Sequence, residues 1–335
     1  MVYQLSGSSS TDDDDVIAAV VWGPGQPFVM EEVRVQPPQK MEDESQRAYP
    51  RILGHEASGV VESVGEGVRN MEEGDYVVPI FNGECGECRC CKSEKTNICS
   101  KYGVNPFKKV MVNDGNTRFS TKDGKPIFHF LNTSTFSNYT VVDSACVVKI
   151  DSHLSPLTPK NMTLLSCGVS TGVGAAWNTA NVGSGSTVAI FGLGAVGLAV
   201  AEGARARGAS KIIGVDINST KFIKGQKMGL THFINPTDLD QPLHEGWGLT
   251  VVLGIHPTPR MLPLHPMELF NGRTIVGSIF GGFKGKTQLP HFAKQCMTGV
   301  VDLDKFITHE LPFDSINDAF QLLVEGKSLR CLLHI

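Results

Sequence analysis

Residues 187–197 have the sequence TVAIFGLGAVG, and Asp216 follows nineteen residues after Gly197. The apolar run at 187–191 is typical of a short buried strand, and the alanine-rich residues 195–207 predict a helix after it. Glycines at 192, 194 and 197 permit a tight turn that brings a pyrophosphate to the N-terminus of this helix. Asp216 can accept hydrogen bonds from the adenosine ribose and would repel a 2′-phosphate, which favours NAD over NADP. A tight glycine turn beside a strand-end aspartate, with no nucleotide, is the alternative.

The chain beyond residue 186 alternates between strands and helices. We expect strands at 187–191, 211–215, 231–234, 249–255 and 274–279, and helices at 195–207 and 220–228. Such alternation predicts an α/β fold with a parallel, doubly wound sheet. A six-stranded dinucleotide fold has one strand more than these five.

The preceding part of the chain has a different character. Between residues 16 and 150, short β-like runs are broken by glycine and proline, at 18–22, 59–64, 76–81 and 139–142. They predict a β-rich domain of barrel type. Residues 1–15, with four successive aspartates, are expected to form a disordered tail. A length of 335 residues also exceeds the usual size of a single core, so two domains are expected.

Charge and hydropathy exclude some classes of partner. A formal net charge of −4 without a basic stripe gives no reason to expect nucleic acid or an anionic membrane. The most apolar stretch, residues 188–200, is short and contains three glycines, so it does not predict a membrane span. Neither end has a recognisable targeting signal, so a cytoplasmic protein is expected.

A cysteine-rich loop predicts a structural zinc site. Two, two and seven residues separate its successive sulfurs, which belong to Cys85, Cys88, Cys91 and Cys99. Four thiolates from one short loop can complete a tetrahedron around zinc with no open position, which is typical of a structural site. Cys90 lies inside the loop but off this spacing, and we interpret it as a free thiol.

The cysteines have two alternative interpretations, disulfides and an iron–sulfur cluster. Disulfides need an oxidising compartment, whereas the chain has an odd number of cysteines, nine, and no apolar signal segment. An iron–sulfur cluster also uses two-residue spacings, but its fourth cysteine is closer and is followed by proline, and Ser100 follows Cys99 here.

A third motif is Gly54-His55-Glu56, followed by Gly59, Gly65 and Val68. By itself such a histidine–glutamate pair is more often a packed, hydrogen-bonded pair than a metal site. Together with the cysteine loop and the glycine turn, the motif resembles the zinc-containing medium-chain alcohol dehydrogenases. The resemblance extends over nearly the whole chain and includes LSCGVSTG at 165–172, FHFL at 128–131, STF at 134–136, IFGGFK at 279–284 and GKSLR at 326–330. The loop at 103–113 is most similar to the plant alcohol-dehydrogenase-like branch.

The resemblance implies a domain arrangement and a reaction. A GroES-like catalytic domain would span 16–168 and 280–335, with the zinc lobe at 85–99, and an NAD-binding Rossmann domain would span 169–279. The family implies a cytosolic homodimer that transfers hydride between a primary or secondary alcohol, or its aldehyde or ketone, and NAD. The branch that oxidises S-(hydroxymethyl)glutathione shares nearly all of these motifs and is an alternative.

The resemblance also implies site residues. Cys85, Cys88, Cys91 and Cys99 match the structural zinc ligands, and His55 and Cys167 match two of three catalytic zinc ligands, with Glu56 as the neighbouring carboxylate. The implied cofactor-binding residues are Thr171, Gly192, Leu193, Gly194, Ala195, Val196, Gly197, Asp216, Lys221, Leu253, Ile255, Phe280 and Arg330. Among them, Thr171, Leu253, Ile255 and Phe280 match positions beside the nicotinamide, and Arg330 matches a pyrophosphate contact.

One part of the family pattern is absent between Met41 and Arg51. The family has there the first catalytic zinc cysteine, then the hydroxyl residue and the histidine of a proton relay, whereas this chain has no cysteine before Cys85. Even the loss of groups that only orient zinc ligands lowers metal affinity or activity about ten- to a hundredfold, so the loss of a thiolate ligand should cost more. Asp43, Glu44 or Glu56 could supply an oxygen ligand instead.

A second part is absent after Pro236, where the fourth Rossmann strand and its helix are missing. That loss leaves the strand at 187–191 with an open edge, at about 1–3 kcal/mol for each buried unsatisfied group. Residues 249–255 could pair there only through a crossover at 238–247, which is barely long enough. The two gaps are typical of an alternatively spliced or incorrectly assembled gene product. We therefore expect turnover to be greatly reduced or absent, and a catalytically inactive, zinc-stapled protein or dominant-negative dimer partner is a further alternative.

Overall fold

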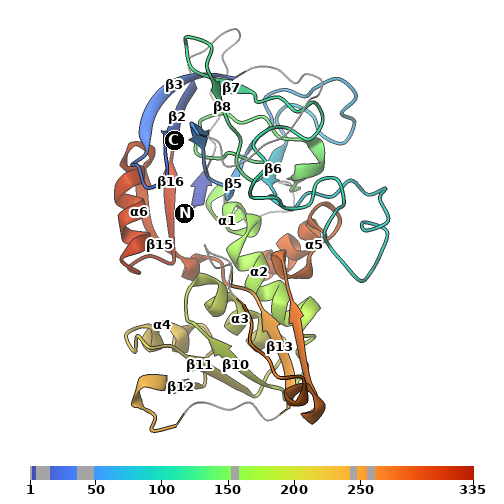
Figure 1. Cartoon of the computed structure of the whole chain (residues 1–335), viewed down its shortest axis with the longest axis vertical. Coiled ribbons are helices and arrows are strands. Elements are labelled where there is room, and N and C mark those ends of the chain that lie inside the picture. Colours follow the sequence, from blue (N-terminus) through green and yellow to red (C-terminus); the bar gives the residue numbers. More distant parts are fainter. Residues whose placement is uncertain (1, 5–15, 36–48, 152–157, 242–246, 255–260) are drawn as a thin grey trace. The chain divides into compact units, whose positions relative to one another are not determined.

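The structure, a computed structural model, describes residues 2–4, 16–35, 49–151, 158–241, 247–254 and 261–335 (Figure 1). The chain forms two compact units. The first consists of residues 1–167 and 284–335, and the second of residues 168–283. Strands dominate the first unit, whereas strands and helices alternate along much of the second.

Two sheets make up the first unit. The larger has the strand order β15-β16-β1-β5-β6-β9, formed by Ile307–Pro312, Arg330–His334, Val2–Gln4, Ala57–Val60, Tyr76–Pro79 and Val147–Lys149. The smaller has the order β4-β2-β3-β7-β8, formed by Arg51–Ile52, Val16–Val21, Val29–Val35, Phe119–Ser120 and Pro126–Ile127. Because β16 pairs in parallel with β1, segments near both ends of the chain join one sheet.

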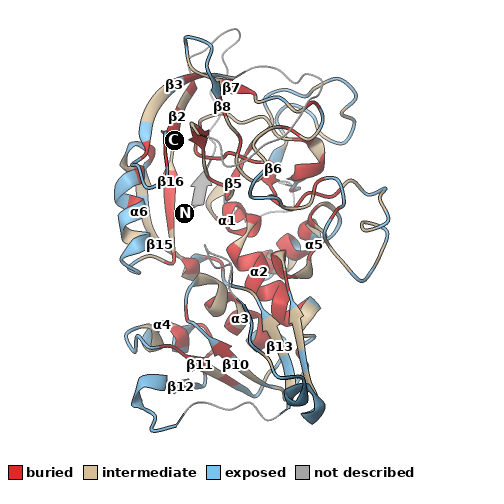
Figure 2. Cartoon of the chain, viewed as in Figure 1, coloured by how far each residue is buried: buried red, intermediate tan, exposed pale blue. Residues whose placement is uncertain are grey.

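Helices and turns complete this unit and its core. They are α1 (Pro159–Thr163), α5 (Gly285–Met297), α6 (Ile316–Val324) and the 3-10 turns η1 (Ser144–Cys146), η3 (Leu164–Ser166), η8 (Asp304–Phe306) and η9 (Phe313–Ser315). Side chains of both sheets and of α6 pack into one cluster that includes Val20, Ile52, Phe119, Ile316 and Leu333, all fully buried. Figure 2 shows the buried residues along β16 and the exposed side of α6. Burying each large apolar side chain contributes about 1.5–3 kcal/mol.

Three sequence predictions for this unit are corrected by the structure. The strand expected at 59–64 is β5, which begins earlier and ends at Val60. Residues 139–142 do not form a strand, because pairing with β2 is limited to a single bridge between Ser137 and Ala18 and the chain then continues irregularly into η1. The strand forms later, as β9, where β6 offers an edge. Residues 2–4, expected in a disordered tail, form β1 because β16 and β5 pair with it on either side. The remainder of the expected tail lies outside the described residues.

The second unit contains three of the five predicted strands in one parallel sheet. Its strands are β10 (Thr187–Phe191), β11 (Lys211–Val215) and β12 (His232–Ile234), in that order. Helices α3 (Ala195–Ala206) and α4 (Lys221–Lys227) alternate with them along the chain, and η5 (Pro236–Asp238) follows β12. The predicted bounds of these three strands and of helices α3 and α4 are correct to within one residue.

The other elements of this unit lie outside the three-stranded sheet. They are α2 (Gly168–Gly174), the π-helical turn η4 (Ala175–Thr179), β13 (Gly248–Val252), η6 (Pro266–Asn271), β14 (Arg273–Gly277) and η7 (Phe280–Gly282). Strands β13 and β14 form a separate parallel pair. None of the helices in the described parts of the chain is long and apolar enough to cross a membrane.

Strand β10 has an open edge, as the missing fourth strand predicts. Among the described residues it pairs only with β11, so β13 has not moved in beside it. Strands of a doubly wound sheet are normally buried on both faces. Three of the five residues of β10 are exposed instead, and Phe191 retains 59% of its accessible surface.

Candidate functional site

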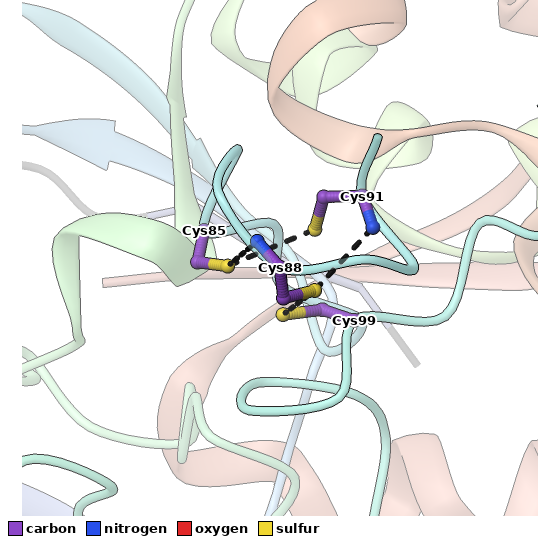
Figure 3. A group of neighbouring side chains, drawn as sticks. All are labelled: Cys85, Cys88, Cys91 and Cys99. Carbon is purple, nitrogen blue, oxygen red and sulfur yellow. Dashed lines mark hydrogen bonds between the residues drawn. The ribbon is translucent and has the colours of Figure 1, made fainter. Parts of the chain in front are cut away.

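The four cysteines of the predicted structural zinc site lie together in the first unit (Figure 3). The sulfurs of Cys85 and Cys91 are 3.8 Å apart, and those of Cys88 and Cys99 are 3.9 Å apart. A tetrahedral site with Zn–S bonds near 2.3 Å has sulfur–sulfur edges of about 3.8 Å. The four sulfurs therefore have the spacing that a zinc ion requires, and Cys90 is not part of the group.

Backbone amides of the loop donate to these sulfurs. The amide of Cys91 lies 3.3 Å from the Cys88 sulfur, and that of Tyr102 lies 3.3 Å from the Cys99 sulfur. Such bonds favour the thiolate. The Ser100 side chain and the Cys91 amide lower the pKa of Cys88 to about 5, whereas burial raises the pKa of Cys91 to about 12. Zinc binding must therefore displace the Cys91 proton.

Lys284 and the first turn of α5 contact the cysteine loop and the residues that lie beside it. The buried carboxylate of Glu84 accepts the Thr287 amide at 3.1 Å, which satisfies an unpaired donor at the helix start. Lys284 Nζ donates to the Cys91 carbonyl at 2.6 Å, and Lys286 Nζ donates to the Ser144 carbonyl at 2.9 Å. Sequence reasoning missed Glu84 and Lys284 as parts of the lobe, because about 200 residues separate them from their partners.

The first unit also brings His55, Glu56 and Cys167 together. His55 Nε2 lies 3.3 Å from the Cys167 sulfur and 4.0 Å from Glu56 Oε1. Gly54 permits this arrangement: its φ is +85°, and a Cβ there would meet the Phe136 ring at 2.6 Å. The three ligand atoms lie within 4.8 Å of one another.

Of these three side chains, only Cys167 is in a protonation state that a zinc ion would have to change. Burial lowers the pKa of His55 to about 4, so its imidazole is neutral and suited to a metal. Burial, with the negative charge of Glu56, raises the pKa of the Cys167 thiol. Cys167 therefore holds its proton at neutral pH unless a cation displaces it.

Glu56 is bound by Arg330. Arg330 Nε donates to Glu56 Oε2 at 2.8 Å, and Nη2 donates to Oε1 at 2.9 Å. Although burial alone would raise it, the charge of Arg330 lowers the pKa of Glu56 below its usual range. The third guanidinium nitrogen, Nη1, donates to the Leu329 carbonyl at 2.8 Å. The predicted pyrophosphate contact is thus an ion-pair partner of Glu56 in this structure.

Glu56 is the one of these three possible metal ligands that an arginine already binds. A catalytic zinc ion usually has three protein ligands and one open position. His55 and Cys167 have no ion pair with Arg330, whereas each oxygen of Glu56 accepts one Arg330 N–H and keeps a further lone pair. Asp43 and Glu44, the other oxygen ligands considered, lie outside the described residues.

The second unit forms the predicted glycine turn. Gly192, directly after β10, has φ +91°, and a Cβ on Gly197 would lie 2.0 Å from the Gly192 carbonyl oxygen. Neither position accepts a larger residue without strain. Gly194 is the N-cap of α3 and has no capping side chain, so the first-turn amides are suited to an anion such as pyrophosphate. Leu193, Ala195 and Val196 lie in the same turn.

Asp216 joins this turn from the end of β11. Its Oδ2 accepts the Leu193 amide and Lys221 Nζ, both at 2.8 Å, and its Oδ1 accepts the Asn218 amide at 2.8 Å. These partners outweigh the effect of burial and lower the pKa of Asp216. An ionised carboxylate therefore lies beside the glycine turn, where Lys221 partly balances its charge.

Thr171 and Phe280, both expected beside the nicotinamide, are far apart in the sequence but lie near each other in this unit. Gly281 packs so closely on α2 that a Cβ there would lie 2.8 Å from the Thr171 carbonyl oxygen, which brings Thr171 near Phe280. On the other side of α2, a Cβ on Gly172 would lie 2.4 Å from the Val196 carbonyl oxygen in α3. The turn η7, helix α2 and the start of α3 are therefore contiguous. Leu253 follows β13, and Ile255 lies outside the described residues.

Family models match both units. The alcohol dehydrogenase GroES-like domain matches residues 32–152, and the zinc-binding dehydrogenase model matches residues 195–253. "Alcohol dehydrogenase-like 3" of Arabidopsis thaliana is 60% identical over 379 residues, with 95% of each chain covered. "Alcohol dehydrogenase 1" of Solanum tuberosum is 46% identical over 369 residues, with 94% of this chain and 96% of the relative covered.

Solved structures give the same result for the fold. An alcohol dehydrogenase zinc-binding domain protein from Burkholderia ambifaria superposes with a TM-score of 0.84 at 26% identity, covering 96% of this chain and 99% of the other. Benzyl alcohol dehydrogenase from Acinetobacter calcoaceticus superposes with a TM-score of 0.81 at 24% identity, with the same coverage. The β-rich unit is thus GroES-like and the second unit is of Rossmann type.

The alignments also bear on the two gaps. The alignment with the Arabidopsis relative spans 379 positions, whereas 95% of this 335-residue chain is about 318 residues. About 60 positions of the alignment therefore have no residue in this chain. Because both proteins are covered to 95%, those positions lie within the aligned region and not beyond its ends.

Proposed function

Because this chain belongs to the zinc-containing medium-chain alcohol dehydrogenase family, we propose that it is an NAD-binding alcohol dehydrogenase-like protein with an occupied structural zinc site and greatly reduced turnover. The missing cysteine carries the proposal, because no cysteine precedes Cys85 and the segment before Arg51 therefore supplies no thiolate to the site of His55 and Cys167. The ion pair between Glu56 and Arg330 supports the proposal, because Arg330 competes with a metal ion for the Glu56 carboxylate.

The structural zinc part of the proposal rests on the four-sulfur group. Cys85, Cys88, Cys91 and Cys99 would hold the ion, which stabilises a loop too polar to bury a core of its own. The amide donors on their sulfurs support the thiolate form that the ion needs.

The loss of turnover follows from what the chain's own residues offer. In the family, a catalytic zinc ion polarises the alcohol oxygen. Here no cysteine precedes Cys85, so His55 and Cys167 lack the third ligand of the family site, and Glu56 is paired with Arg330. Residues 41–51 also contain no histidine that could carry the alcohol proton away. We therefore assign no proton-transfer step to this chain.

The NAD part of the proposal rests on the glycine turn and Asp216. The pyrophosphate would bind at the start of α3, and Asp216 would accept hydrogen bonds from the adenosine ribose and repel a 2′-phosphate. Thr171, Leu253, Ile255 and Phe280 would contact the nicotinamide half. Arg330 would reach a pyrophosphate only with N–H groups that Glu56 and Leu329 do not use.

The remaining features of the proposal come from the family. We propose a homodimer in the cytosol, with a primary or secondary alcohol, or its aldehyde or ketone, as the substrate class. A non-catalytic, zinc-stapled product of splicing is the second candidate, and the roughly 60 unmatched alignment positions favour it.

Steady-state kinetics tests the proposal. Purified, zinc-supplied protein is assayed with ethanol and NAD beside a full-length plant alcohol dehydrogenase prepared in the same way. We expect a kcat/KM at least a hundredfold below that of the full-length enzyme. A rate equal to that of the full-length enzyme would overturn the proposal.

A further inference from the structure

The turn η7 has a backbone conformation that its neighbours must maintain. Phe280, Gly281 and Gly282 have φ values of +52°, +62° and +73°, so three successive residues are left-handed. Glycine adopts this region freely, whereas a bulky residue such as phenylalanine does so only under strain. Phe280 is 1% exposed, so the residue with the strained backbone is also buried.

The contacts that hold this turn come from the π-helical turn η4. Asn178 Nδ2 donates to the Gly281 carbonyl at 3.0 Å. The hydroxyls of Thr179 and Ser278 are 2.8 Å apart. Two adjacent residues therefore bind the chain on either side of Phe280. π-Helical turns are rare and occur frequently at functional sites.

The same helical run carries Thr171. Helix α2 and η4 are continuous from residue 168 to residue 179, and Gly174 is so close to the turn that a Cβ there would lie 2.4 Å from the Gly281 carbonyl oxygen. The positions of Thr171 and Phe280 are thus fixed by one rigid set of contacts. Asn178 and Thr179 bind the residues on either side of Phe280, so a change at either acts first on η7.

We propose that Asn178 and Thr179 are positioning residues for the nicotinamide half of the dinucleotide site. Neither touches the reacting atoms: they hold η7 in its strained form and so keep Phe280 beside Thr171. The inference rests on the proposed function, because it takes η7 and the helix that carries Thr171 as the part of the site beside the nicotinamide.

Two probes separate the halves of the site. NADH contains the nicotinamide, and ADP-ribose contains only the adenosine, pyrophosphate and second ribose. Calorimetric titration of both probes compares the wild-type full chain with Asn178→Asp, which keeps the size of the side chain but replaces the donor with an acceptor. We expect the Kd for NADH to rise about three- to tenfold, as for a lost hydrogen bond, and that for ADP-ribose to stay within about twofold.

A second variant and a control make the test specific. Thr179→Val removes the bond to Ser278 at nearly constant volume and should have the same selective effect, while Thr179→Ser should retain NADH binding. Thr231→Val is the matched control, because it removes hydrogen bonds to Ile212 at the start of β11, the opposite end of that strand from Asp216. It should leave the ratio of the two Kd values unchanged.

The outcomes distinguish the two levels of inference. If wild type binds neither probe, the dinucleotide function is overturned and the positioning role with it. If wild type binds both, the positioning role alone is overturned when Asn178→Asp and Thr179→Val weaken NADH and ADP-ribose equally, or weaken neither. If Asn178→Asp fails to fold, Thr179→Val decides the question by the same criterion.

Discussion

Arg330 and Glu56 form a buried, two-point ion pair between residues 274 positions apart in the chain. Their side chains are 12% and 3% exposed. The pair joins strand β16 to the segment just before β5, and it commits the carboxylate nearest His55 to an arginine. In a site that already lacks a thiolate, this pairing favours a structural over a metal-binding role for Glu56.

Removal of Arg330 should strongly destabilise the first unit. In Arg330→Met the Glu56 carboxylate stays buried without its partner, and breaking such a pair costs about 3–5 kcal/mol. Urea denaturation followed by circular dichroism measures the change. Lys327→Met is the control, because its pair with Glu325 is exposed and should contribute about 1 kcal/mol or less. Equal stability of the two variants would contradict a buried pair.

His129 should make the protein sensitive to acid. It is 2% exposed and accepts the Arg118 amide at 3.1 Å, and burial, with the charge of Arg118, lowers its pKa from 6.5 to about 3. Between pH 6.5 and 3 the unfolded chain binds a proton that the folded chain does not, so the free energy of unfolding falls as the pH falls.

Comparison with His129→Gln isolates this contribution. Between pH 7 and pH 4, wild type should lose about 3 kcal/mol more stability than the variant, on the basis of 1.36 kcal/mol per pKa unit. The measurement is a series of urea titrations at each pH. Parallel curves for the two proteins would show that His129 does not titrate as described.

The cysteine loop offers a matched pair of variants for the structural zinc site. Cys99→Ser removes one of the four grouped sulfurs, whereas Cys90→Ser changes a neighbouring thiol outside the group. We expect Cys99→Ser to lose most of its zinc and to melt at a lower temperature, because zinc binding contributes directly to folding. Cys90→Ser should match wild type in zinc content by mass spectrometry. The reverse pattern would contradict the ligand assignment.

Strand β10 should show the effect of its open edge. Ile190 is buried and faces the core, so Ile190→Ala should cost about 2–4 kcal/mol. Phe191, with 59% of its surface exposed, should cost about 1 kcal/mol or less when replaced by alanine. Chemical denaturation of both variants measures the difference. A cost of 3 kcal/mol or more for Phe191→Ala would mean that another strand or chain covers this edge.

Features encoded in short stretches were predictable from the sequence. Strand β10, the glycine turn and helix α3 follow each other within twenty residues, and each depends on local periodicity and on glycine geometry. The spacing of the cysteines likewise contains most of the information about the sulfur group, because one loop supplies all four.

Features that depend on distant pairing were not predictable. Residues 139–142 have the composition of a strand, but a strand forms only where a partner edge is available, and β6 offers that edge to β9. The pairing of Arg330 with Glu56, and the packing of Gly281 on α2, join segments more than 100 residues apart. No spacing rule connects such positions in a single sequence.

The number of zinc ions bound per chain tests the central claim most directly. Plasma mass spectrometry of the purified full chain, dialysed against zinc and then against buffer, gives the ratio of metal to protein. We predict one zinc ion per chain, held by the cysteine loop and lost in Cys99→Ser. Two zinc ions per chain in wild type, with one retained in Cys99→Ser, would contradict the claim that His55, Glu56 and Cys167 no longer form a catalytic zinc site.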